Sequence, residues 1–305
     1  MPSRSSHLSL IGAPTSAGAY APGQEKAPAA FRQVGLVDLL ANQQVRVIDR
    51  GDVSGFRWRP DPANRRAMHA AAVADVATAV AWEVAEAVQH GNGALVLGGD
   101  CTVELGTVAG VVAAGVTSVG LVYVDLDTDL NTPTSTADGA LDWMGVAHLL
   151  GIPGTICELT AIGRRVPLLQ PEQVMFFAHA NVEPCERRVI TEHGIAETPC
   201  AEVAADPWRA GQKASHWARR FDRLLVHLDV DVLSFVDTPL AENVRRNLGL
   251  RLDTLMLAIT PLLHAPNLTT LTITEVNPDH GAPDGSTLRG FAEALATVLS
   301  GSRFT

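Results

Sequence analysis

The sequence predicts an α/β fold in which helices cover both faces of a mostly parallel sheet. Short apolar runs alternate with longer stretches of helix-forming residues along the 305 residues, the pattern of repeated strand–helix units. Several of these runs are continuously apolar, as expected of strands that are covered on both faces. No linker, low-complexity tract or internal repeat interrupts the chain, so we expect one domain over residues 1–305.

The predicted strands are short runs dominated by Val, Leu and Ile, which favour a pleated, buried backbone. In chain order they are residues 8–11, 45–48, 94–97, 119–124, 174–177, 224–228 and 269–275. Five longer stretches have helix-forming composition: residues 64–90, 101–114, 206–220, 252–263 and 286–299. The longest of them contains neither proline nor glycine, which is typical of an uninterrupted helix.

Composition and charge argue against several classes of protein. Hydrophobic residues make up 47% of the chain and charged residues 18%, which favours a packed core over disorder. The net charge of −10, without a long basic block, argues against binding to nucleic acid or to an acidic membrane. The N-terminus lacks an apolar signal core, and no stretch approaches the roughly 18 residues of a membrane span. The four cysteines form no C-x-x-C pair, which fits free thiols in a reducing compartment, so we predict a cytoplasmic protein.

Five aspartates follow two of the apolar runs. They are Asp125, Asp127 and Asp129 after the fourth predicted strand, and Asp229 and Asp231 after the sixth. If the strand pleat continues through these aspartates, alternate residues point to one face of the sheet. Both groups would then lie beyond the carboxyl ends of the strands, which is where parallel sheets bind ligands. Carboxylates gathered there repel one another unless cations or dense hydrogen bonding offset the charge, and hard oxygen donors suit Mn or Mg. The alternative is that they are solvated acidic residues at strand ends.

Two further motifs accompany the aspartates. Residues 98–101 read Gly-Gly-Asp-Cys directly after a predicted strand, and residues 275–278 read Glu-Val-Asn-Pro. Glycines there permit a tight turn and a close approach of backbone to the site. In order and spacing, these motifs resemble the ureohydrolase (arginase/agmatinase) family, over nearly the whole chain. The resemblance implies a single three-layer αβα domain with a central, mostly parallel sheet of about eight strands, assembled as a homo-oligomer, a trimer or hexamer.

The resemblance also implies a reaction and a site. Such enzymes hydrolyse a C–N bond of a guanidino, N-hydroxyguanidino or related amidine compound, and two Mn ions activate the attacking hydroxide. The six metal ligands would be Asp125 and Asp229 on both ions, Cys101 and Asp129 on one, and Asp127 and Asp231 on the other. Asp129 would orient the hydroxide and collect its proton. Glu275 would accept hydrogen bonds from the cationic small-molecule substrate.

Two of these ligand positions depart from the family pattern. Cys101 and Asp127 each stand where the family's motifs have histidine. The usual shell of four carboxylates and two neutral imidazoles carries −4, whereas the five aspartates here carry −5, or −6 with a Cys101 thiolate. The added charge makes bound water less acidic, and a thiolate favours softer metals such as Zn, Fe or Co. A branch of the family that hydrolyses N-hydroxyarginine is similar in carrying cysteine here; the alternative is a small buried Cys101 without a metal contact.

Substrate contacts are expected on the segments that follow the aspartates. The resemblance assigns Asn131, Ser135 and Thr136 to an amino-acid carboxylate and Glu183 to its amino group. Trp143 is a candidate for the pocket wall. Residues of the loop after the second aspartate pair, Asn243, Arg245, Arg246 and Asn247, are candidates for its rim, with a solvated or interfacial position as the alternative. Asp142 stands where the family has a histidine proton shuttle, and a carboxylate donates a proton near neutral pH only if its pKa is raised. Glu183 has the alternative role of a helix-start acid and Trp143 that of a packing residue. His148 is either a substitute shuttle or a hydrogen-bonded helix histidine.

Two rival functions accompany this hypothesis. A metal-poor paralogue would keep the fold and bind a guanidino ligand or stabilise a partner enzyme without turnover, and the residues at 101, 127 and 142 favour that alternative. A metal-dependent deacetylase on a related fold is less well supported, because its histidine-pair signature is absent.

Overall fold

An eight-stranded sheet forms the middle layer of the structure, a computed structural model that describes residues 7–163, 165–244 and 248–304. Its strands are β1 Leu8–Gly12, β2 Val47–Asp52, β3 Gly93–Leu97, β4 Val119–Val124, β5 Val174–His179, β6 Ala196–Pro199, β7 Arg223–Asp229 and β8 Leu268–Thr274. The order across the sheet is β2-β1-β3-β8-β7-β4-β5-β6, and every neighbouring pair is parallel. The predicted α/β class is therefore confirmed, and the sheet is parallel throughout.

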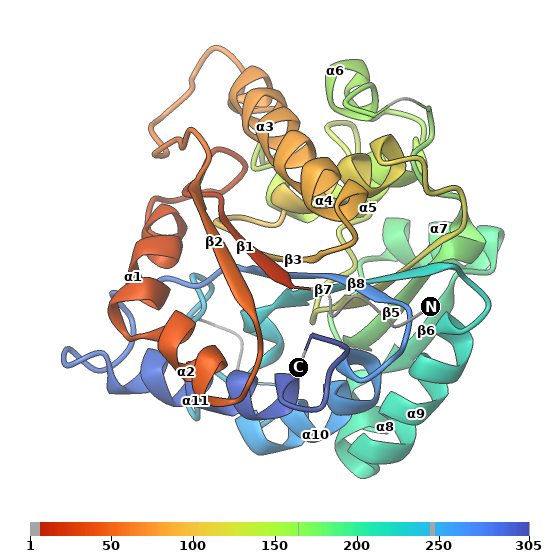
Figure 1. Cartoon of the computed structure of the whole chain (residues 1–305). Coiled ribbons are helices and arrows are strands. Elements are labelled where there is room, and N and C mark those ends of the chain that lie inside the picture. The colour runs from red at the N-terminus through yellow and green to blue at the C-terminus, as the bar shows by residue number, and fades with distance from the viewer. Residues whose placement is uncertain (1–6, 164, 245–247, 305) are drawn as a thin grey trace.

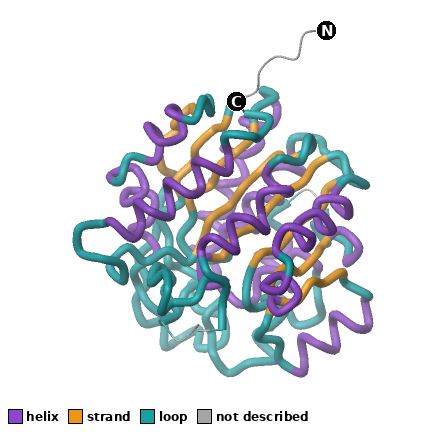
Figure 2. The backbone as a smooth tube through the Cα atoms, turned by 90° about the horizontal axis from the view of Figure 1, so that it is seen from below, coloured by secondary structure: helices purple, strands orange, loops and turns teal. Residues whose placement is uncertain are grey.

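Helices cover both faces of this sheet (Figure 1). One layer consists of α3 Ala70–Gln89, α4 Val103–Ala113, α5 Gly145–Leu150, α6 Cys157–Thr160 and α7 Pro184–His193. The opposite layer consists of α1 Ala27–Gln33, α2 Leu36–Asn42, α8 Cys200–Ala205, α9 Pro207–Ala218, α10 Leu252–Leu263 and α11 Ser286–Leu299. Figure 2 shows the strands side by side between these layers. Within the described segments, no helix combines the length and the hydrophobicity that crossing a membrane requires.

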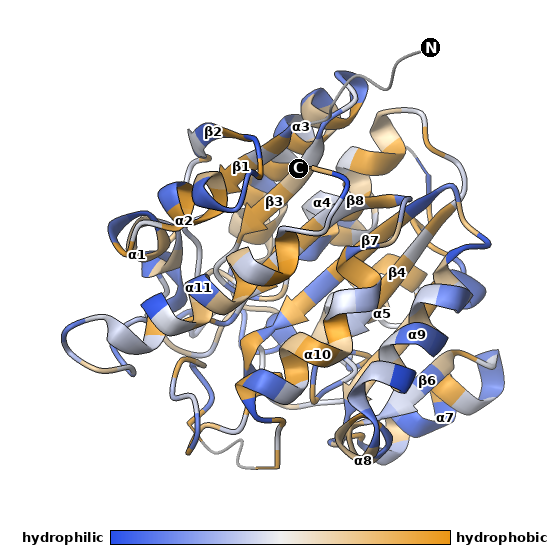
Figure 3. Cartoon of the chain, turned by 60° about the horizontal axis from the view of Figure 1, so that its bottom comes forward, coloured by the Kyte–Doolittle hydropathy of each residue, from blue (hydrophilic) through white to orange (hydrophobic). Residues whose placement is uncertain are grey.

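The central strands are apolar because each of their faces contributes to a different core. In β4, Val122 and Val124 belong to the hydrophobic cluster that includes residues of α9 and α10, whereas Leu121 and Tyr123 belong to the cluster of α3 and α4. All six residues of β4 are buried. Strands covered on both sides are continuously hydrophobic, as Figure 3 shows for the centre of the sheet. This double covering leaves the strand ends as the place for polar residues.

Two glycines bring α4 unusually close to α3. Gly106 and Gly110 lie four residues apart and therefore on one face of α4. A Cβ on Gly106 would come within 2.4 Å of the Ala77 carbonyl oxygen, and one on Gly110 within 2.6 Å of that of Ala81. The two helices can therefore pack backbone to backbone, which holds the start of α4, just after residues 98–101, against the sheet.

The structure contains elements that were not predicted, among them the helices α1, α2 and α5 to α8, and it shifts the bounds of some predicted ones. The edge strand β6 was not predicted, because its sequence Ala-Glu-Thr-Pro is short and partly polar. The predicted helix 64–90 begins only at Ala70. His69, which precedes it, has a φ of 54° and donates its backbone N–H to Asp61 Oδ2 at 3.1 Å, so the chain turns there instead of continuing the helix.

Candidate metal centre

Four strands that are neighbours in the sheet supply the candidate site. In sheet order they are β3, β8, β7 and β4, and their carboxyl ends lead to the Gly98–Cys101 loop, Glu275, Asp229 and Asp125. The chain passes from β3 to β4 without pairing them, and β7 and β8 later fill the space between. Residues far apart in the sequence therefore meet at one edge of the sheet, where parallel α/β folds bind ligands.

The strands do not run on through the aspartate motifs, contrary to the sequence-based expectation: β4 ends before Asp125, and β7 ends at Asp229 itself. β4 ends at Val124, and Asp125 accepts the backbone N–H of Asp127 through Oδ1 at 2.7 Å. Asp229 accepts the N–H of Asp231 in the same way, also at 2.7 Å. In each pair the first aspartate closes a turn by accepting the backbone N–H of the aspartate two residues later. The side chain of that second aspartate is therefore positioned by the turn. The prediction that a strand pleat aligns these side chains is wrong; two matching turns do so.

Two of the site residues adopt a left-handed backbone conformation. Asp129 has a φ of 50° and Glu275 a φ of 62°, which residues other than glycine rarely adopt. Such conformations cost of order 1–3 kcal/mol and are concentrated at functional sites. Glu275 is held by its backbone N–H, which donates to the Gly99 carbonyl oxygen at 2.8 Å. The predicted strand 269–275 therefore ends one residue early, at Thr274.

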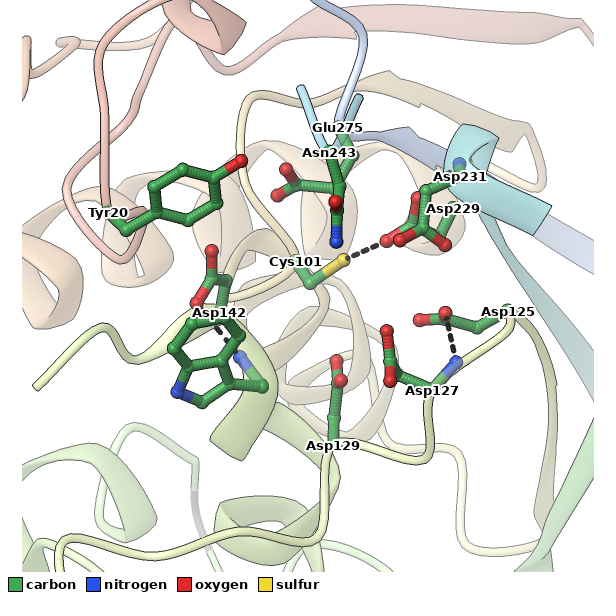
Figure 4. A pocket seen from close by; sticks show the side chains of 11 residues that line it. Tyr20, Cys101, Asp125, Asp127, Asp129, Asp142, Asp229, Asp231, Asn243 and Glu275 are labelled. Atoms are coloured by element: carbon green, nitrogen blue, oxygen red, sulfur yellow. Dashed lines mark hydrogen bonds between the residues drawn. The ribbon is translucent and has the colours of Figure 1, made fainter. Parts of the chain in front are cut away.

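The side chains from these loops converge on one pocket (Figure 4). Its lining residues are Tyr20, Cys101, Asp125, Asp127, Asp129, Asp142, Trp143, Asp229, Asp231, Asn243 and Glu275. The pocket thus contains the six predicted metal ligands and the three predicted catalytic residues. Seven of its described lining residues are carboxylic acids and none is a lysine or arginine. The charge of the cluster is not offset by basic side chains of the lining.

Donor atoms in the pocket form two overlapping groups. In one, atoms of Cys101, Asp125, His227 and Asp229 all lie within 4.8 Å of one another, and in the other, atoms of Asp125, Asp127 and Asp231 do so. Asp125 belongs to both, as expected of a residue that bridges two ions. Asp129 lines the same pocket outside either group, and its Oδ2 accepts the hydroxyl hydrogen bond of Tyr123.

Burial makes the negative charge of this cluster costly. It raises the pKa of the Asp125 carboxyl well above its usual range, and the carboxyls of Asp229 and Asp129 raise it further. The pKa values of Asp129, Asp229 and Glu275 are raised in the same direction, with burial as the main cause. Burial and the nearby Asp229 also raise the pKa of the Cys101 thiol. The metal-free cluster therefore retains protons that a bound cation would displace.

The donor set fits divalent cations. Asp125 is 1% exposed, and its Oδ2 has no hydrogen-bond partner among the described residues, so an oxygen lone pair is available inside the pocket. Asp229 presents Oδ2 to the same space, where it accepts the Cys101 Sγ–H at 3.0 Å. Carboxylate oxygens suit Mn and Mg, and the thiol adds a softer ligand that suits Zn or Co.

Asp142 is placed to hold a proton and His148 is not. Asp142 lines the pocket, and burial, followed by the charge of Glu275, raises its pKa well above the usual range. A carboxyl in that state can donate a proton. His148 accepts the Ile156 N–H through Nε2 at 3.1 Å, so its Nδ1 donates to the Met144 carbonyl at 2.7 Å. His148 is therefore a satisfied helix histidine, which was the alternative given for it.

The predicted substrate residues lie in a hollow that adjoins the pocket. Asn131, Thr136, Glu183 and Trp143 line it, together with Asp127, Asp138, Asn181 and Glu186. Ser135 donates its hydroxyl hydrogen bond to Asn131 Oδ1 at 2.8 Å, so it orients Asn131. Glu183 also caps α7 in a reciprocal capping box with Glu186. Of the predicted rim 243–247, Asn243 lines the pocket, and residues 245–247 lie outside the described residues.

Sequence reasoning missed Tyr20, which forms an aromatic wall with the predicted Trp143, and the support beneath the site. Tyr20 stacks on Trp143 with ring centroids 6.1 Å apart and an interplanar angle of 11°. Its only signal was a tyrosine two residues after Gly18, in the loop that follows the first predicted strand. Beneath the pocket, Tyr123 and Glu104 contact His227, although their positions inside a strand and a helix predict packing roles.

The chain matches the model of the arginase family over residues 6–300. It is 30% identical to Arginase-1 of Rattus norvegicus, covering 98% of this chain and 94% of that protein. It is also 30% identical to the arginase of Bacillus caldovelox, covering 97% of each. The native structure of the Bacillus caldovelox enzyme matches with a TM-score of 0.85 and 27% identity over 96% of this chain and 98% of that one. This chain is therefore a member of the arginase family, a family of hydrolases.

Proposed function

We propose that this chain is a metal-dependent amidinohydrolase that cleaves a C–N bond of a guanidino, N-hydroxyguanidino or related amidine compound. The observation that carries the proposal is the pocket itself: seven carboxylic residues and a thiol, without a basic side chain among its described lining residues. Such a cluster requires cations or protons to offset its charge. Membership of a hydrolase family favours cations that serve catalysis.

The six predicted ligands would hold two divalent ions, with Mn expected from the family and a softer metal favoured by Cys101. Such ions, when bound, lower the pKa of water and stabilise charge at the carbon under attack. Asp129 orients the water and accepts its proton, since Tyr123 already holds Oδ2 in place. The oxygen of the water adds to the guanidino carbon, whose C=N electron pair moves to nitrogen; the C–N bond then breaks, and Asp142 donates a proton to the departing nitrogen.

Glu275 is arranged to bind the cationic end of the substrate. Its Oε2 accepts the side-chain N–H of Gln24 at 3.0 Å, while its buried Oε1 has no partner among the described residues. That oxygen can accept an N–H of the guanidinium group. The wall of Tyr20 and Trp143 offers aromatic faces to the same cation.

The adjoining hollow favours a substrate with an amino-acid-like tail. Asp138, Glu183 and Glu186 give the hollow the charge that attracts an ammonium group. Asn131 Oδ1 already accepts hydrogen bonds from Ser135 and from the Cys185 thiol, at 2.8 and 3.6 Å, so its Nδ2 can donate to a substrate carboxylate. The hollow thus offers complementary groups to both ends of an amino acid.

The experiment is elemental analysis of protein purified without chelator, combined with assays for urea and hydroxyurea release from arginine, N-hydroxyarginine and other guanidino compounds. We expect about two divalent ions per chain and product release that depends on added Mn or Zn. The rival, a ligand-binding paralogue without turnover, would bind guanidino compounds and release no product with any of these metals. That second result would overturn the proposed reaction.

A cytoplasmic location and a homo-oligomeric state, trimer or hexamer, are parts of the same proposal. Size-exclusion chromatography followed by light scattering measures the oligomeric state directly. All four cysteines are free in the structure, which fits a reducing compartment.

We expect Trp143→Ala to weaken substrate binding more than turnover. Trp143 lines both the carboxylate pocket and the adjoining hollow, so its loss removes an aromatic face from the cation. A desolvated cation–π contact contributes about 2 kcal/mol, so KM should rise roughly tenfold or more. The matched control is Trp82→Ala, because Trp82 is 68% exposed on α3. Equal kinetic changes in the two variants would contradict a binding role for Trp143.

A further inference from the structure

We propose that His227 is a direct metal ligand and that it forms, with Cys101, Asp229 and Asp125, a sulfur–nitrogen–oxygen site for Zn or Co. The inference rests on the proposed metal centre and assigns a ligand that the sequence motifs of the family do not contain. His227 lies in β7 two residues before Asp229, so both side chains point to the same face of the strand. It is fully buried, and its Nε2 lies 3.5 Å from Cys101 Sγ.

The distances match tetrahedral coordination. With Zn–S of about 2.3 Å and Zn–N of about 2.0 Å, tetrahedral geometry separates the sulfur and nitrogen by roughly 3.5 Å. The observed separation of Cys101 Sγ and His227 Nε2 is 3.5 Å. Asp229 Oδ2 lies 3.0 Å from the same sulfur, and one donor atom of each of the four residues lies within 4.8 Å of the others. Asp125 adds a buried oxygen without a partner among the described residues.

The surroundings of His227 leave its Nε2 lone pair facing the site. On the other side of the ring, Nδ1 lies 3.3 Å from Glu104 Oε2, and Glu104 is 1% exposed. A carboxylate only accepts hydrogen bonds, so Nδ1 carries the proton and Nε2 keeps its lone pair. This carboxylate–histidine arrangement is the usual support of a metal-bound imidazole, because it fixes the tautomer and raises the basicity of the ligand.

Two further contacts hold the ring in position. Tyr123 stacks on His227 with centroids 4.0 Å apart and an interplanar angle of 2°. The Thr274 hydroxyl lies 3.2 Å from both His227 Nε2 and Cys101 Sγ. The hydroxyl of Tyr123 also donates to Asp129. One aromatic residue therefore supports both the proposed nitrogen ligand and a predicted oxygen ligand.

With His227 as a ligand, the cysteine at position 101 does not leave the site without an imidazole. The Gly-Gly-Asp-Cys loop lacks the histidine expected from the family, but β7 supplies the imidazole of His227, which lies beneath the pocket with Nε2 3.5 Å from Cys101 Sγ. In this chain the imidazole comes from β7 instead of the glycine loop, and the Cys101 thiol lies beside it. A Cys101→His substitution alone would place two rings where one ring and one sulfur fit. A thiolate and an imidazole on one ion favour Zn or Co over Mn.

Cobalt substitution tests the assignment without an activity assay. Metal-free full-length protein is titrated with Co(II) and followed by absorption and by proton NMR. We expect a thiolate-to-cobalt charge-transfer band and one paramagnetically shifted, exchangeable imidazole N–H signal, which is the Nδ1 proton held by Glu104. His227→Asn should lose the shifted signal, keep the thiolate band, and bind Zn more weakly by more than the roughly 10- to 100-fold that an outer partner costs.

The matched control is His148→Asn, which replaces another buried histidine that is bonded to backbone groups. It should keep the band, the shifted signal and the Zn affinity. A wild-type cobalt complex with the thiolate band but no shifted imidazole signal would overturn the role of His227 and leave the proposed hydrolase intact. Failure of the wild type to bind Co, Zn or Mn would instead overturn the metal centre itself. The wild-type spectrum is informative even if a variant does not fold.

Discussion

Asp125→Asn is expected to abolish metal binding and hydrolysis while making the metal-free protein more stable. Asp125 is the residue common to both donor groups, so its loss affects both proposed ions. Metal ions contribute several kcal/mol to stabilising the transition state, and a loss of about 4 kcal/mol lowers kcat by roughly 1,000-fold. Titration with Mn and Zn, followed by steady-state kinetics, measures both effects.

The gain in stability follows from the cost of burying this charge. In the metal-free protein the Asp125 carboxyl either stays ionised beside Asp129 and Asp229 or takes up a proton, and its raised pKa records that cost. Asparagine removes the charge and still accepts the Asp127 N–H through Oδ1, which is a 2.7 Å bond in the wild type. We expect the free energy of unfolding to rise by on the order of 1 kcal/mol.

The control for this variant is Asp38→Asn, in the first turn of α2 and exposed. It should leave metal binding unchanged and alter stability by less than about 0.5 kcal/mol. If Asp125→Asn keeps the wild-type metal content and rate, Asp125 is not a bridging ligand. If its metal-free form is less stable than the wild type, the electrostatic account of the cluster is wrong.

Removing the metal should destabilise the protein, and by more as the pH rises. The folded-state pKa values of Asp125, Asp129, Asp229 and Glu275 are raised in the metal-free protein. Groups of this kind stabilise the native state below their unfolded pKa, near 4, and lose that contribution as the pH rises through the folded value. Bound cations keep the carboxylates ionised and bind more tightly when fewer protons compete.

The measurement is the difference in Tm between protein with chelator and protein with metal, at several values from about pH 5 to about pH 8. At a free metal concentration of 100 times Kd the stabilisation is about 2.7 kcal/mol, which corresponds to roughly 5 °C for a chain of this size. We compare the difference in Tm between the metal-free and metal-bound protein, because surface ion pairs such as Arg32 with Asp49 change the stability of both forms alike. A Tm difference that stays constant or decreases with rising pH would contradict the prediction. In Asp125→Asn, which lacks the proposed bridging ligand, this Tm difference should be smaller at every pH.

The central strands and the helices α3, α4, α9, α10 and α11 could be predicted because burial leaves a clear composition, whereas α1, α2 and α5 to α8 were not predicted. Seven of the eight strands overlap the predicted apolar runs; Val119–Val124 has the predicted bounds, whereas β2, Val47–Asp52, begins two residues after the predicted start at residue 45. β6 is the exception, because an edge strand is not enclosed by the core and has no need of an apolar sequence. Turn residues such as His69 were also not predicted, because their conformation depends on a distant partner, here Asp61.

For the site, the residue types were predictable and their arrangement was not. Carboxylates that directly follow apolar strands indicate a ligand-binding edge, and all six predicted ligands line one pocket. The strand pleat offered as the reason was wrong, because the Asp125 and Asp229 carboxylates turn the chain through their own backbone hydrogen bonds. The hydrogen-bonded role of His148 depends on the N–H of Ile156, which local sequence does not reveal.

By itself the sequence determined the α/β class, the acidic character of the site and the motifs that resemble the arginase family. These follow from local chemistry: apolar runs must be buried, and a strand end is where polar residues are tolerated. Only the tertiary structure decided that His227 lies beside Cys101, 126 residues away, with Glu104 behind it, 123 residues away. The physical reason is the sheet order, in which β7 and β8 insert between β3 and β4 and bring a strand histidine to the glycine loop.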